Sequence, residues 1–308
     1  MSVKSALHPR LTGLFPLIRV TIEDSIQKNN MRQQAEHYFE AISEVLNADR
    51  DIYQARLAQE KMLDGEGPKN ENEADFRDNA QQVFDRFQLY RQYLEEEPED
   101  LLSPFESFNT LYNDWLTSSE SLIATSKGST QFSATMINLD AKFQVIRNML
   151  DEAGEQLRTH THNTKDQIRS AEELNSYVEA ITEVLNADRD LYQARLAQQK
   201  IINGVGNSSE NKEDFNLNAA QALDRFRAYR GNLINNPELT KPYSKFDVLF
   251  NEWFEESLAH LNSPEAQISN KLPQEIINAD EKFAAIRAML DKAGETVRNH
   301  SREIESKT

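Results

Sequence analysis

The chain contains one long segment twice in nearly the same form. Residues 43–61 read SEVLNADRDIYQARLAQEK, and residues 182–200 read TEVLNADRDLYQARLAQQK. Subtracting the position of Asp49 from that of Asp188 gives an offset of 139 residues. This offset is far longer than a solenoid repeat and close to the size of a small domain. We therefore expect one unit that is present twice in series.

The composition predicts that this unit is helical. The chain has 308 residues, enough for two domains that each bury a core. With 9 Gly and 9 Pro it permits long uninterrupted helices, and it lacks the alternating runs of Val, Ile and Thr that indicate strands. We predict an all-α fold.

Charge and cysteine content exclude several classes of partner and chemistry. The net charge is −17, from 51 acidic and 34 basic residues, and it repels nucleic acid and anionic lipid, which are bound largely through Lys and Arg. Without cysteine there is no disulfide, thiol nucleophile or thiolate metal site. No stretch reaches the roughly 20 apolar residues of a membrane span. The most apolar stretch, Leu11–Ile22, either packs on the folded body or is the remainder of a membrane-anchoring start.

Apolar side chains recur at steps of three and four residues along four stretches of each repeat, which is typical of helices that bury one face. In the first repeat these stretches begin near Met31, Glu73, Ser103 and Gln131, and the second repeat keeps the same order. We predict two tandem antiparallel four-helix bundles, residues 31–165 and residues 166–308, after a partly ordered N-terminal segment, residues 1–30.

The junction between the repeats favours a continuous helix. From Phe132 to Ile202 there is no proline, and Gly154 is the only glycine. The last helix of the first bundle would then continue into the second and stack the bundles end to end, over roughly 90 Å. The poor helix formers at Thr159–Thr164 leave open a bend with side-by-side packing. The pattern favours the end-to-end rod.

Three polar residues stand on the buried stripe of the first helix, where Leu or Ile would be expected: Asp49, Tyr53 and Arg56. A charge inside a bundle destabilises it unless it has a partner. The favoured interpretation is an ion pair between helices that fixes their register, with Arg86 or Asp85 as the partner. A second is a pocket for a small polar ligand, in which Arg binds a carboxylate, Asp an amine, and Tyr supplies shape. The third is exposure to solvent, if the stripe is rotated by one position.

The second repeat keeps the same three residues, at Asp188, Tyr192 and Arg195, with Arg225 or Asp224 as the partner. Whatever the set does is therefore expected twice. The candidate ligand-binding residues are Asp49, Tyr53, Arg56, Asp188, Tyr192 and Arg195.

Nothing in the sequence points to catalysis, a metal or a cofactor. Trp115 and Trp253 are expected in the core. His160 and His162 would diverge on a helix, and no carboxylate completes a metal set with them. No Gly-rich phosphate loop, nucleophile elbow, Ser/His/Asp set or inward Glu-x-x-His pair occurs. We predict that the protein is not an enzyme.

The string LNADRDIYQA at residues 46–55 resembles the first helix of the four-helix-bundle sensor domains of bacterial methyl-accepting chemotaxis receptors. Further similarities are the Asp-Arg-Phe segment at Phe87, Trp115, and the segment MLDEAG at residues 149–154. The resemblance covers residues 31–165 and 166–305. It implies a domain that dimerises, binds small molecules or binding proteins, and passes a small helix displacement across the membrane.

The chain departs from that family because it contains neither the transmembrane helices nor the cytoplasmic signalling hairpin, and because it has two sensor-like units. We expect a sensor module that binds a small polar ligand, at the periplasmic face of the inner membrane if it is a receptor region, or a cytoplasmic relative if the chain is complete as written. A homodimer is one expectation from the resemblance. The alternative is a structural protein, a rigid acidic rod for protein partners.

Overall fold

The computed structural model describes residues 14–124, 130–164, 172–202, 204, 206–262 and 274–307. The described chain is all-α, as predicted from the composition. Its eight long helices are α1 (Leu14–Asp64), α2 (Lys69–Tyr93), α3 (Phe108–Ala124), α4 (Thr130–Thr164), α5 (Glu172–Ile202), α6 (Ser208–Asn232), α8 (Phe246–Asn262) and α9 (Gln274–Lys307). Short helical turns complete the connections: η1 (Glu99–Leu101), η2 (Ser103–Phe105), α7 (Pro237–Thr240) and η4 (Lys241–Tyr243).

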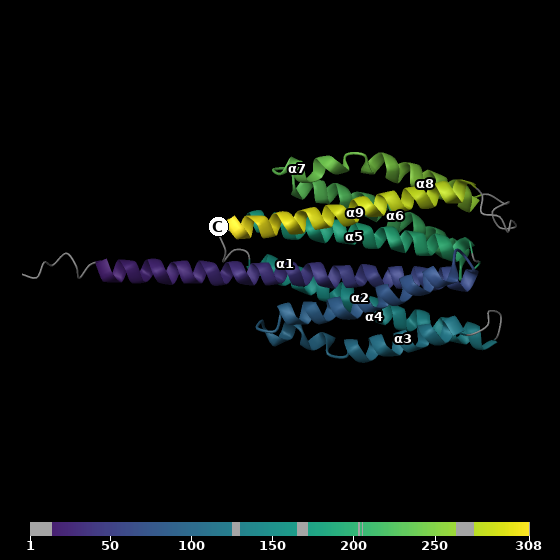
Figure 1. The fold of residues 1–308 in the computed structure, drawn as a ribbon, viewed down its shortest axis with the longest axis horizontal. Coiled ribbons are helices and arrows are strands. Elements are labelled where there is room, and N and C mark those ends of the chain that lie inside the picture. Colours follow the sequence, from purple (N-terminus) through teal and green to yellow (C-terminus); the bar gives the residue numbers. More distant parts are fainter. Residues whose placement is uncertain are drawn as a thin grey trace, which may run out of the picture.

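Helices α1 and α5, which carry the duplicated segment, pack against each other in the middle of the molecule (Figure 1). Helices α2 and α4 pack on α1, while α6 and α9 pack on α5 in the same way. The outermost helices are α3, which contacts α4, and α8, which contacts α9. The two repeats, α1–α4 and α5–α9, therefore lie side by side.

The predicted end-to-end stacking is wrong, and the burial of the central helices explains why. From Tyr38 to Glu60, nearly every side chain of α1 is buried, the charged ones included. A helix that is buried all round must be covered on every side. Helices α2 and α4 leave one side of α1 open, and α5 covers it. The predicted continuous helix would cross residues 165–171, which lie outside the described residues.

Helix α1 begins at Leu14, earlier than the predicted start near Met31. Pro16 falls in its first turn, where the missing N–H removes no hydrogen bond of the helix. In Figure 1 this N-terminal part of α1 extends beyond the other helices. How the side chains of Leu11–Ile22 pack lies outside the described residues.

Helix α1 ends at Asp64, directly before a turn that contains two glycines and Pro68. Gly65 and Gly67 have φ of 72° and 70°, in the left-handed region that favours glycine. The equivalent turn after α5 has Gly204 and Gly206 at 66° and 71°. The same local chemistry thus ends both central helices.

The buried apolar residues of both repeats form one contiguous core. Trp115 and Trp253 are fully buried, as predicted. Aromatic rings fasten the outer helices in matching ways: Phe87 stacks on Phe108, and Phe226 on Phe246, each at 3.7 Å between ring centroids. The packing of the duplicated unit is therefore closely preserved.

Candidate functional site

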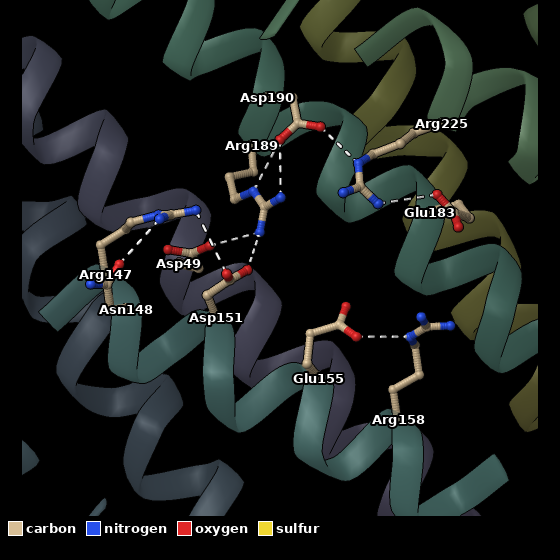
Figure 2. Close-up of polar contacts among 10 residues, drawn as sticks. All are labelled: Asp49, Arg147, Asn148, Asp151, Glu155, Arg158, Glu183, Arg189, Asp190 and Arg225. Carbon is tan, nitrogen blue, oxygen red and sulfur yellow. Dashed lines mark hydrogen bonds and ion pairs between the residues drawn. The ribbon is translucent and has the colours of Figure 1, made fainter. Parts of the chain in front are cut away.

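A layer of buried charges lies where α1 and α5 meet, and it contains two of the predicted site residues. Asp49 and Asp188 are both 0% exposed. Asp49 lies opposite Arg189 of the other repeat, with 3.3 Å between Oδ2 and Nη1 (Figure 2). Asp188 lies opposite Arg50, with 3.6 Å between Oδ2 and Nη1. The two charge pairs thus cross the contact between the repeats in opposite directions.

Each of these arginines also binds acids in its surroundings. Arg189 donates to Asp151 of α4 at 2.5 Å and to Asp190 at 3.0 Å (Figure 2). Arg50 donates to Asp291 of α9 and to Asp51, both at 2.8 Å. Two opposite charges in every pair offset part of the cost of burial, and the network fixes the register of α1 against α5.

The second helices close this network, although not through the predicted pairs. Arg86 of α2 binds Asp51 at 2.7 Å and Glu44 at 3.0 Å. Its counterpart Arg225 binds Asp190 at 2.7 Å. The partners of Asp49 and Asp188 come from the other repeat instead. They are Arg189 and Arg50, the residues that follow Asp188 and Asp49 in the chain. Arg50 and Arg189 each follow the buried Asp by one position, so they lie beside the stripe of α1 or α5 and not on it.

Burial raises the pKa of Asp49 and of Asp188 to about 6, because water no longer solvates the carboxylate. The arginine opposite each carboxylate, Arg189 or Arg50, opposes the shift. Within the described chain, neither carboxylate oxygen of Asp188 accepts a hydrogen bond. The pKa of the neighbouring Tyr192 is raised as well, chiefly by burial and then by the charge of Asp188.

Arg56 and Arg195 lie further along the central helices and have local partners. Arg56 is 1% exposed and binds Asp140 of α4 at 2.8 Å and Glu60 at 2.5 Å. Arg195 is 3% exposed, binds Asp280 of α9 at 2.6 Å and lies 3.9 Å from Glu66 in the turn after α1. The third interpretation, exposure to solvent, is therefore wrong for both.

The predicted tyrosines pack against aromatic rings of the fourth helix of each repeat. Tyr53 meets Phe143 edge to face at 5.2 Å between centroids, and Tyr192 meets Phe283 at 5.5 Å. The three residues of one set therefore do not converge. The Asp lies in the charge layer, the Tyr in the core and the Arg in a separate ion pair.

A cavity of about 340 Å³ lies between α1, α2, α5 and α9. Of the predicted residues, Tyr192 and Arg195 line it. Sequence reasoning missed its other polar residues, which come from both repeats: Gln54, Lys61, Asp75, Asn79, Asp280 and Arg287. They belong to helices far apart in the sequence, so no local motif joins them.

Other site types are not found in the described chain. Its described His, Asp and Glu residues form no group of three that could hold a metal ion. None of its described helices is long and apolar enough to span a membrane. No protein-family model matches the sequence, and neither a curated protein nor a solved structure matches it.

Proposed function

We propose that this chain is a non-enzymatic sensor module that binds a small polar ligand in the cavity between α1, α2, α5 and α9. The observation that carries the proposal is the cavity itself. It has room for a small molecule, it is lined by polar groups, and it includes Tyr192 and Arg195. In this proposal α1–α4 and α5–α9 act as two four-helix bundles that share the contact between α1 and α5.

The position of the cavity suggests how binding would be transmitted. Lys61 belongs to α1, whereas Arg195 and Arg287 belong to α5 and α9, so a ligand that touches all three joins the two repeats. A ligand shifts an equilibrium only by its different affinity for the two states. A bound molecule would favour the position of α9 relative to α1 in which residues of both helices reach it. Such a shift of α9 is the kind of helix displacement that the resemblance to chemoreceptor sensor domains implies. The proposed binding needs no cofactor.

The alternative is a structural or interaction protein, a rigid acidic body for protein partners. The paired charges around Asp49 and Asp188 favour it, because their visible role is to hold α1 and α5 in register. The net charge of −17 would favour basic surfaces on such a partner.

A thermal-shift screen separates the two proposals. Amino acids, organic acids and amines are added to the protein, and a ligand that binds the folded state raises its melting temperature by mass action. We expect at least one class to do so, and we expect Arg195→Ala to lose the response. Arg56→Ala, which removes the equivalent buried arginine outside this cavity, is the matched control and should keep it. A screen without any response would reject the sensor and favour the structural alternative.

A further inference from the structure

The cavity has more positive than negative groups on its wall. Lys61, Arg195 and Arg287 line it, together with Asp75 and Asp280. Arg195 is already neutralised by Asp280, at 2.6 Å. In the described part of the chain, neither Lys61 nor Arg287 forms an ion pair. The charge of Arg287 acts on Asp188 without a contact ion pair. An anion would therefore find two cations that have no contact ion pair in the described chain.

Two lining residues also hold hydrogen-bond donors that lack an acceptor. Gln54 Nε2 and Arg287 Nε are both buried, and neither donates a hydrogen bond within the described chain. The guanidinium of Arg287 lies over the ring of Tyr192, 5.8 Å from its centroid, so the ring holds the cation at the cavity wall. A buried donor without an acceptor costs free energy, and a carboxylate offers acceptors only. The chemistry of the wall thus matches a carboxylate.

Comparison of the two repeats shows how far the residues of the cavity wall are shared between them. Each lining position has an equivalent in the other repeat, and all of them carry the same residue except one. The exception is Ala284 of α9, whose counterpart on α4 is Gln144. The longer side chain of Gln144 adds an amide where Ala284 leaves a methyl group. In the first repeat the counterpart of Arg195 is Arg56, which also binds the carboxylate of Glu60. The residue equivalent to Glu60 in the second repeat is the neutral Gln199.

We propose that the cavity binds the carboxylate of a small organic acid through Lys61 and Arg287, and that Ala284 makes the second repeat the one that binds. The inference rests on the proposed function and gives it a ligand class and a stoichiometry of one per chain. Lys61 is supplied by the first repeat and Arg287 by the second. The site is therefore complete only when the two repeats are packed together.

Isothermal titration of the full chain tests the ligand class, with succinate as the anionic probe and succinamide as the neutral probe of matched shape. We expect succinate to bind at one site per chain and succinamide not to bind. Arg287→Gln should weaken succinate binding at least about tenfold, because it removes a hydrogen bond to a charged group. Binding of succinamide as tightly as succinate, or no binding of succinate, would overturn the inference.

Three further variants test the role of Ala284. Ala284→Gln introduces the residue of the first repeat and should abolish succinate binding, whereas Ala285→Gln, at the next position and outside the cavity lining, should leave it unchanged. Gln144→Ala should raise the stoichiometry towards two. Succinate binding that survives Ala284→Gln would overturn the role of Ala284. If amines or neutral solutes raise the melting temperature while succinate does not, the proposed carboxylate ligand is rejected and the sensor proposal stands. If no solute binds, both the carboxylate ligand and the sensor proposal are rejected.

Discussion

Arg189 of the second repeat lies 3.3 Å from Asp49 of the first, and both side chains are buried at the centre of the molecule. The pair shows that the duplicated segment packs against its own copy. Each repeat supplies an acid and a base to the same contact, since Arg50 and Asp188 form the reciprocal pair at 3.6 Å. The buried charges of α1 are therefore complementary to the buried charges of α5.

Arg189→Ala should destabilise the fold strongly. It leaves Asp49 buried with no opposite charge at hydrogen-bonding distance, and loss of one member of a buried pair costs about 3–5 kcal/mol. Urea unfolding at neutral pH measures the change. Arg227→Ala, which removes an exposed pair with Asp224, is the control and should cost under about 1 kcal/mol. Equal effects of the two substitutions would contradict a central role for the pair.

The stability of the protein should depend on the ionisation of Asp188. Its pKa rises from 3.8 to about 6 on folding, so the folded state holds this proton at a higher pH than the unfolded state does. The contribution to stability is present below pH 3.8 and is lost as the pH rises through about 6. It changes by up to about 1.4 kcal/mol for each pH unit in that window.

Asp188→Asn should remove this component. The variant should be more stable than the wild type at pH 7.5, and the difference should shrink as the pH falls below about 6. The free energy of unfolding, measured from pH 4.5 to 7.5, provides the test. Asp78→Asn, an exposed site, should leave the pH profile unchanged. A wild-type advantage that grows at pH 7.5 would show that the ionised Asp188 stabilises the fold.

Two equivalent glycines should respond differently to alanine. A Cβ at Gly294 would lie 3.4 Å from Leu185 Cδ2, in ordinary contact, whereas at Gly154 it would lie 3.1 Å from Leu46 Cδ2. Gly294→Ala should therefore stabilise the protein by about 0.5–1 kcal/mol, the usual advantage of alanine within a helix. Gly154→Ala should gain less, because Leu46 must move. Thermal unfolding measures both, and equal gains would show that α4 and α9 pack equally closely.

The sequence predicted the local features of this fold well. The all-α class follows from composition, and the end of α1 at Asp64 follows from the glycines that come directly after it, because both depend on neighbouring residues. The end-to-end stacking was wrong because it was argued from the absence of helix breakers between Phe132 and Ile202. That absence permits a continuous helix but contains no information about what covers the remaining side of α1.

The candidate site was predicted only in part, for a similar reason. Periodicity identified Asp49 and Asp188 as buried charges, yet their partners Arg189 and Arg50 belong to the other repeat. Lys61 was missed because the cavity that it lines is formed together with α9, which lies far away in the sequence. A contact between two repeats becomes visible only when the side-by-side arrangement is known.

The most direct test of this arrangement uses a pair of cysteines, which is clean because the natural chain has none. Gln199 donates to Glu66 at 2.9 Å, although these residues sit at the far ends of their central helices and would be widely separated in an end-to-end rod. With Glu66→Cys and Gln199→Cys together, a short bis-maleimide should cross-link the monomer internally. A control pair, Glu66→Cys with Asn236→Cys in the turn at the opposite end of α6, should not react internally. Efficient internal cross-linking of the first pair alone is the predicted result. Its absence, with both cysteines reactive, would contradict the side-by-side packing and the shared cavity.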